Sequence, residues 1–346
     1  MTKQFMAGIA ASSADFNPND LKLMREAGLT WLRTGIKGFD HQRFLSGEKQ
    51  PDDFYRTSEK VTELRKSGFQ FMGLTPGPDQ MLAEAGTPGS PEYFDSYRRI
   101  CAFLADQFNG LIDYWQVANE LDIWIFRGSL TLEQSVQFLK AGLLGIKQAD
   151  VRLQTGINIT LFPSKPGEVD GNTDQHEGVY IAKGIYQDPA VEVDYAGFDS
   201  YPGTWREGGA ESWHEYLDAF HNLVKKPIII QEFGYSSAGE MMTEAEKERR
   251  AYPCEVKRWR FAWMGGHTPK IQANFIAESY RIFAQKPYVL GATYYRWKDQ
   301  ATCWQCGKAD CPAETAWGLL ELDGSLKPSY YSLQASLAGL TSRASN

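Results

Sequence analysis

Two short apolar segments of the chain each end in a glutamate. One reads Asp113-Tyr-Trp-Gln-Val-Ala-Asn-Glu120 and the other reads Pro227-Ile-Ile-Ile-Gln-Glu232-Phe-Gly. Runs of β-branched and aromatic residues of this length are typical of buried strands. A carboxylate that follows a buried parallel strand lies at the mouth of an α/β barrel, where such folds carry their active sites. Two carboxylates at that mouth suit glycoside hydrolysis, one as acid/base and the other as nucleophile.

Strand-like segments recur along the chain, and helical patterns separate most of them. The predicted strands are 5–10, 31–34, 69–74, 114–118, 153–159, 195–199, 227–231 and 290–296. The predicted helices are 19–27, 91–109, 132–148, 178–186, 212–224, 271–285 and 328–340. This alternation favours one (β/α)8 barrel, a TIM barrel, that forms a single domain over residues 1–346. No Gly-x-Gly-x-x-Gly follows an early strand, which argues against a dinucleotide-binding domain.

The connections from strand to helix are the long ones. They span residues 35–56, 75–90, 160–177, 202–211, 234–270 and 297–327. Long loops gathered on one face of a barrel indicate its functional end. We therefore expect extended loops around the catalytic face.

Composition excludes several classes of partner. The net charge is -7 and no basic block is present, so nucleic acid is not an expected partner. No run of about 18 apolar residues occurs, so we expect no membrane partner. No secretory signal is visible, although a chain with a trimmed signal would look the same, so cytoplasmic and secreted locations both stay open. The oligomeric state also stays open.

The glutamates and their neighbours resemble a known group of enzymes. Asn119-Glu120 after the fourth predicted strand, together with Glu232 after the seventh, resembles the catalytic residues of clan-A glycoside hydrolases. The resemblance implies that Glu120 is the general acid/base and that Glu232 is the nucleophile. It also implies that Asn119 binds the sugar 2-hydroxyl. The alternative is that both glutamates are barrel-end residues held in ion pairs.

Three further positions fit the same resemblance. Arg33 ends the second strand and resembles an arginine that lies close to the nucleophile. Tyr201, in Gly197-Phe-Asp-Ser-Tyr-Pro, resembles the sixth-strand tyrosine that hydrogen-bonds the nucleophile. Trp297, in Tyr294-Tyr-Arg-Trp-Lys-Asp, resembles the eighth-strand tryptophan that forms the floor of the sugar subsite. The ordered set covers nearly the whole chain.

The family within the clan is not placed. The segment Glu232-Phe-Gly-Tyr-Ser is somewhat similar to β-mannanases, and Phe198-Asp-Ser-Tyr-Pro is similar to endo-galactanases. The chain departs from the large cellulase-type family, because Ser200 stands where that family usually has a histidine.

The high aromatic content raises the question of sugar stacking. The chain has 10 tryptophans, and aromatic rings offer rigid amphipathic surfaces to sugars. Trp124 and Trp205 lie in segments expected at the catalytic face, so both are candidate substrate-binding residues beside Trp297. Ordinary packing within the loops is the alternative.

Four of the five cysteines form a pattern in the loops. Cys303, Cys306 and Cys311 follow the eighth predicted strand, and Cys254 follows the seventh, which is its neighbour in a barrel. The Cys-x2-Cys-x4-Cys spacing suits a closed tetrahedral zinc site of structural type. Two disulfides or free thiols are the alternatives. Cys101 lies in a helical pattern and is expected to be a buried small hydrophobic residue.

No catalytic metal or other cofactor is expected. The five histidines, at positions 41, 176, 214, 221 and 267, show no ligand-like spacing. The leading hypothesis is a retaining enzyme that hydrolyses β-glycosidic bonds in a polysaccharide or oligosaccharide, with β-mannan or β-glucan substrates favoured. The alternatives are a carbohydrate-binding barrel without activity and an unrelated barrel enzyme.

Overall fold

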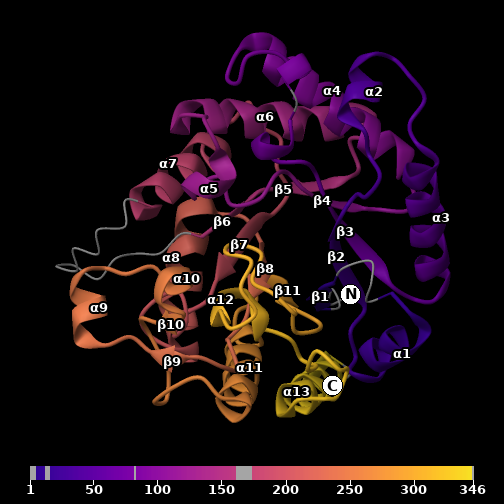
Figure 1. Cartoon of the computed structure of the whole chain (residues 1–346). Coiled ribbons are helices and arrows are strands. Elements are labelled where there is room, and N and C mark those ends of the chain that lie inside the picture. Colours follow the sequence, from indigo (N-terminus) through magenta and orange to yellow (C-terminus); the bar gives the residue numbers. More distant parts are fainter. Residues whose placement is uncertain (1–4, 12–15, 82, 161–173, 345–346) are drawn as a thin grey trace. The chain divides into compact units, whose positions relative to one another are not determined.

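The structure, a computed structural model, describes residues 5–11, 16–81, 83–160 and 174–344. Figure 1 labels its helices and strands along the chain. The chain forms two compact units. The first unit comprises Met1–Thr30, Ser200–Leu217 and Glu232–Asn346, and the second comprises Trp31–Asp199 and Asp218–Gln231. That the chain is one single domain stays a prediction.

The second unit contains most of the parallel strands. In hydrogen-bonded order they are β2 (Trp31–Gly35), β3 (Gln70–Leu74), β4 (Tyr114–Gln116) and β5 (Gln154–Gly156). A second parallel pair joins β6 (Asn158–Ile159) to β7 (Ala196–Ser200). The backbone N–H of Ala196 donates to the carbonyl of Pro227 at 2.8 Å, which joins β7 to the residue before β8 (Ile228–Phe233).

The fifth predicted strand, 153–159, is interrupted at Ile157. Its first part, β5, pairs with β4, while its second part, β6, pairs with β7. Two glycines allow the close approach of chains at this point, because a Cβ on Gly156 would lie 2.5 Å from the Tyr195 ring and one on Gly197 would lie 2.5 Å from the Ile157 carbonyl. At Ile157 the chain therefore passes from one parallel partner, β4, to the other, β7.

The first unit holds the remaining strands. In it β1 (Met6–Ala10) pairs in parallel with β11 (Val289–Tyr294). The N–H of Tyr295 donates to the carbonyl of Phe233, so the end of β8 continues this group of strands. Two short strands, β9 (Glu240–Met241) and β10 (Arg258–Trp259), pair in the long segment after β8.

Helices connect successive strands in each unit. Those of the second unit are α2 (His41–Leu45), α3 (Asp52–Lys66), α4 (Pro91–Gln107), α5 (Trp124–Arg127), α6 (Leu132–Ala149) and α7 (Asp174–Tyr186), while α8 (Trp213–Val224) contains residues of both units. Those of the first unit are α1 (Pro18–Glu26), α9 (Glu244–Glu248), α10 (Pro253–Val256), α11 (Pro269–Phe283), α12 (Pro312–Thr315) and α13 (Pro328–Ala344). Within the described residues there are also three 3₁₀ helices, η2 (Pro78–Gln80), η3 (Ala83–Ala85) and η4 (Ala210–Ser212). Figure 1 shows α4 beside α6 and α11 beside α13, and both pairs are in contact.

Local sequence signals account for most of these elements. Ser90 caps α4 by accepting from the N–H of Tyr93, and Pro91 occupies the first helical position. Asn17 caps α1, and Gly28 follows its end with a φ of 85°, a conformation that favours glycine. Among the described residues no helix is long and apolar enough to cross a bilayer.

The prediction was wrong at α3, which it treated partly as loop. This helix reads Asp-Asp-Phe-Tyr-Arg-Thr-Ser-Glu-Lys-Val-Thr-Glu-Leu-Arg-Lys and buries only Phe54, Val61 and Leu64. Such a narrow apolar stripe among charged residues gives a weak periodic signal. The predicted loop 160–177 lies largely outside the described residues.

Candidate active site

The segment after β4 places Glu120 through an unusual backbone. Ala118 and Glu120 have φ values of 53° and 47°, and they flank Asn119. Each non-glycine residue in this region costs on the order of 1–3 kcal/mol, so surrounding contacts must hold it. The N–H of Ala118 donates to the Thr75 hydroxyl, and the N–H of Glu120 donates to Asn158 Oδ1, both at 2.9 Å. Strain of this kind is concentrated at functional sites.

The Asn119 amide is fixed by three donors. Its Oδ1 accepts from Arg33 Nη2 at 2.8 Å, from Gln116 Nε2 at 3.0 Å and from Asn158 Nδ2 at 2.9 Å. Its Nδ2 donates to Glu120 Oε2 at 3.3 Å. Because the oxygen side of the amide is saturated with donors, the N–H side must face Glu120. Asn119 and Glu120 are therefore brought together as a sequence-adjacent, hydrogen-bonded pair.

Arg33 is hydrogen-bonded to this pair through Asn119. Its side chain is 7% exposed, and its Nε donates to Gln116 Oε1 at 2.7 Å. Gln116 in turn donates to the carbonyl of Ala118 at 2.8 Å. Arg33 thus helps to hold Asn119 in place. That Arg33 lies next to the nucleophile stays a prediction.

Sequence reasoning missed four residues of this network, which are Thr75, Gln116, Asn158 and Asp199. Asn158 donates to Asp199 Oδ2 as well as to Asn119, and both Asn158 and Asp199 are almost fully buried. Asn158 begins the short strand β6, and Asp199 lies beside Ser200 at the end of β7. Polar residues that close a buried strand were the signal that could have found them.

The first unit places Glu232 at the end of β8. The Tyr201 hydroxyl, which lies just after β7, donates to Glu232 Oε2. The Tyr201 ring packs edge-on against Trp317 at 5.0 Å and against Tyr295 at 6.1 Å between ring centroids. The sequence predicted the Tyr201–Glu232 contact, and the structure brings these two side chains together.

Glu314 is a further carboxyl near Glu232 that sequence reasoning missed. It accepts from Gln305 Nε2 at 2.6 Å and from the Tyr295 hydroxyl at 3.2 Å. Burial raises the pKa of Glu314 to about 7, and the charge of Glu232 acts in the same direction. Burial also raises the pKa of Tyr295, as do the nearby Glu314 and Glu232 carboxylates. Nothing in the pattern of the loop sequence distinguished Glu314 from an exposed glutamate.

The three candidate tryptophans lie in different surroundings. Trp297 is fully buried, and its ring packs edge-on against Tyr330. The half-buried ring beside Tyr201 is Tyr295, two residues earlier. Trp205 packs against Trp259 and Tyr252. Trp124, in α5, is 68% exposed. Sugar contacts by Trp297, Trp205 and Trp124 stay predictions.

The four loop cysteines come together, and Cys101 does not belong to them. The sulfurs of Cys254, Cys303, Cys306 and Cys311 all lie within 4.8 Å of one another. Cys101 is fully buried in α4, where burial raises its pKa to about 12. The expectation for Cys101 as a small buried side chain therefore agrees with its surroundings.

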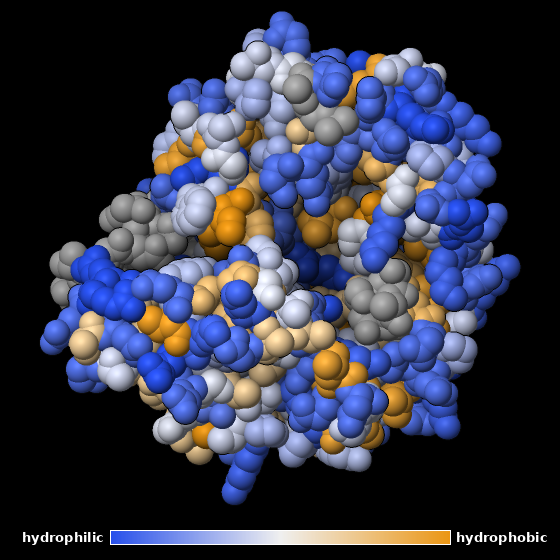
Figure 2. All heavy atoms as spheres, in the orientation of Figure 1, coloured by the Kyte–Doolittle hydropathy of each residue, from blue (hydrophilic) through white to orange (hydrophobic). Residues whose placement is uncertain are grey.

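The surface shown in Figure 2 is mostly hydrophilic, with scattered apolar residues. This agrees with the charged residues making up 23% of the chain. Scattered exposed apolar residues are normal for a folded protein and need no partner to explain them.

Comparisons with known proteins place the fold. No protein-family model matches the chain, and no curated protein matches it by sequence. Among solved structures, the GH53 catalytic domain from Ignisphaera aggregans is 16% identical, with a TM-score of 0.62 and coverage of 97% of each chain.

Two larger proteins are also similar. A glucosidase from Croceicoccus marinus is 15% identical with a TM-score of 0.64, and the match covers 98% of this chain and 68% of that one. A β-glucuronidase from Bacteroides uniformis is 17% identical with a TM-score of 0.62, and the match covers 97% of this chain but only 35% of the enzyme. The chain thus has the parallel-strand barrel fold, with surrounding helices, that these glycoside hydrolases share, as the sequence predicted.

Proposed function

We propose that the chain is a retaining glycoside hydrolase that cleaves β-glycosidic bonds of a polysaccharide or oligosaccharide. The observation that carries the proposal is the pair of glutamates, one shortly after β4 and one near the end of β8, each hydrogen-bonded by polar neighbours of its own. The similar solved structures are described as a β-glucuronidase, a glucosidase and a GH53 catalytic domain, which supports a carbohydrate substrate.

In the first proposed step the Glu232 carboxylate attacks the anomeric carbon. The bond from that carbon to the leaving oxygen breaks while the Glu120 carboxyl transfers its proton to this oxygen. The product is a glycosyl ester on Glu232 and a released alcohol. Tyr201 orients the attacking carboxylate, because its hydroxyl donates to Glu232 Oε2.

In the second proposed step Glu120 acts as a general base instead of a general acid. Its carboxylate takes a proton from water as the water oxygen attacks the anomeric carbon and displaces Glu232. Two inversions give net retention. Asn119 would hold the sugar 2-hydroxyl near Glu120, since its amide N–H side already faces that carboxyl.

The substrate class is the finer part of the proposal. β-Mannan and β-glucan are favoured, and galactan and xylan are the nearest rivals. A panel of aryl β-glycosides, followed by polymeric mannan, glucan, galactan and xylan with product analysis, tests both class and linkage. NMR of the first-formed anomer tests retention.

The outcomes separate the hypotheses. Release of the β-anomer first supports the retaining mechanism, and release of the α-anomer contradicts it. Saturable binding of a glycan without any turnover would favour the carbohydrate-binding alternative. Absence of both binding and turnover across the panel would favour an unrelated barrel enzyme.

A further inference from the structure

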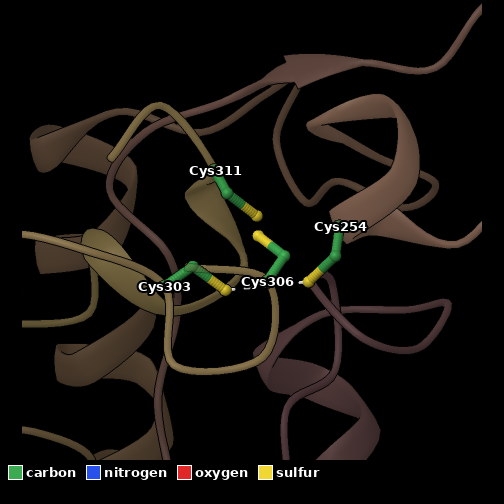
Figure 3. A group of neighbouring side chains, drawn as sticks. All are labelled: Cys254, Cys303, Cys306 and Cys311. Carbon is green, nitrogen blue, oxygen red and sulfur yellow. Dashed lines mark hydrogen bonds between the residues drawn. The ribbon is translucent and has the colours of Figure 1, made fainter. Parts of the chain in front are cut away.

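Four thiols from two segments of the first unit converge on one point. Cys254 lies in α10, in the segment after β8, while the other three lie in the segment after β11. Figure 3 shows the four side chains turned toward one another from both segments. We propose that one zinc ion is bound in a tetrahedral, structural site by the four loop cysteines, Cys254, Cys303, Cys306 and Cys311. This inference does not depend on the proposed function.

The sulfur separations fit a shared metal. A tetrahedral site with Zn–S bonds of about 2.3 Å places its sulfurs about 3.8 Å apart, by simple geometry. The sulfurs of Cys254 and Cys303 are 3.7 Å apart, and all pairs among the four lie within 4.8 Å. A disulfide would need about 2.05 Å between two of them. One common neighbour for four sulfurs is therefore a better fit than two separate pairs.

The backbone between the ligands is shaped for this role. The N–H of Gly307 donates to the carbonyl of Cys303 at 2.7 Å, which closes a tight turn around Cys306. Gly307 has a φ of 71°, a conformation that glycine adopts without strain. The turn brings Cys303 and Cys306 to the same side, as ligands of one ion require.

The surroundings also suit bound thiolates. Cys303 and Cys311 are fully buried in one cluster with Trp259. Such a shell excludes solvent, and outer contacts of this kind hold metal ligands in place.

The site is connected to Glu232 through side chains of the same unit. Gln305, which lies between two of the ligands, donates to Glu314 at 2.6 Å, and Glu314 accepts from Tyr295. The Tyr295 ring packs on Tyr201, which donates to Glu232. A zinc ion that fixes the turn at Gln305 would therefore also fix the surroundings of Glu232.

The test begins with metal content. Protein purified without chelators should contain about one zinc per chain by elemental analysis, and Cys306→Ser should contain far less. Cys306 is suited to this substitution because it is only half-buried, unlike Cys303 and Cys311. Cys101→Ala is the matched control and should keep its zinc, because Cys101 lies in α4. Replacement of zinc by cobalt should give thiolate-to-cobalt charge-transfer absorption in the wild type.

A second measurement keeps the proposal falsifiable if the variants do not fold. Thiols of the wild type are titrated in denaturant with a chelator and without reductant. Five free thiols together with one released zinc support the site. A single free thiol without metal would mean two disulfides and would overturn the proposal. Five thiols without metal, and with no uptake of zinc or cobalt by the native protein, would also overturn it, and bound iron would overturn the choice of zinc.

Discussion

Replacement of Asn158 by alanine should weaken the contacts that position Glu120 while leaving its carboxyl group in place. Asn158 is 2% exposed, and its side chain makes contacts to Glu120, Asn119 and Asp199. Asn119 Oδ1 would keep its other donors, Arg33 and Gln116. The N–H of Glu120 and the Asp199 carboxylate would each lose this partner.

The magnitude follows from these two lost partners. A buried polar group that loses its partner costs about 1–3 kcal/mol, so the two losses in Asn158→Ala should lower the free energy of unfolding by about 2–6 kcal/mol. Chemical denaturation of the purified variants measures it. Asn222→Ala, at an exposed position of α8, is the matched control and should change stability by less than about 0.5 kcal/mol.

Activity of the same variant tests the positioning role. Without the bond from Glu120 N–H to Asn158, the left-handed backbone at Glu120 is held less firmly. We expect kcat to fall about 10–100-fold on poor leaving groups, which corresponds to about 1.4–2.7 kcal/mol of transition-state stabilisation. The loss should be smaller on activated aryl glycosides, where proton donation matters less. Unchanged stability, or equal losses on both substrate types, would refute the reasoning.

Three further substitutions give distinct results. Glu232→Ala should lose turnover, and azide should then yield the glycosyl azide of inverted configuration, because azide takes the place of the missing carboxylate; wild-type-like turnover would contradict the assignment. Glu120→Ala should lose far more activity on poor leaving groups than on activated aryl glycosides, and comparable losses would count against an acid/base role. Glu314 holds its proton more tightly in the folded state, with a pKa of about 7 against an ordinary 4.5, so its contribution to stability is present below pH 4.5 and is lost as the pH rises to 7. At about 1.4 kcal/mol per pKa unit, the free energy of unfolding should fall by about 3 kcal/mol over this range. Urea unfolding of Glu314→Gln between pH 4.5 and 8 should not show this fall. Identical pH profiles for the variant and the wild type would disprove the prediction.

The strands that carry the candidate site were predictable because apolar runs mark them. The runs that end near Glu120 and Glu232 correspond to β4 and β8, since buried parallel strands are apolar on both faces. Tyr201, which directly follows β7, was predicted from the resemblance to clan-A glycoside hydrolases. Helix α3 was missed because only three of its side chains are buried among charged neighbours.

The support of the site was much harder to predict. Asn158 donates a hydrogen bond to Asp199, which lies on another strand far away in the sequence. Such a contact leaves no local periodic signal. At the eighth strand, β11 ends at Tyr294, so the alternation of side chains stops before Trp297. Of these two residues after β11, it is consequently Tyr295 and not Trp297 whose ring packs on Tyr201, together with Trp317.

The most direct test of the central claim is covalent trapping of the nucleophile. The enzyme is incubated with an activated 2-deoxy-2-fluoro β-glycoside of the sugar that the aryl glycoside panel identifies, and the product is examined by intact mass and peptide mapping. We predict time-dependent inactivation with one added glycosyl group, located on Glu232, and no labelling of Glu232→Gln. A label on another residue, or continued hydrolysis with no trapped intermediate, would contradict the proposed double displacement through Glu232.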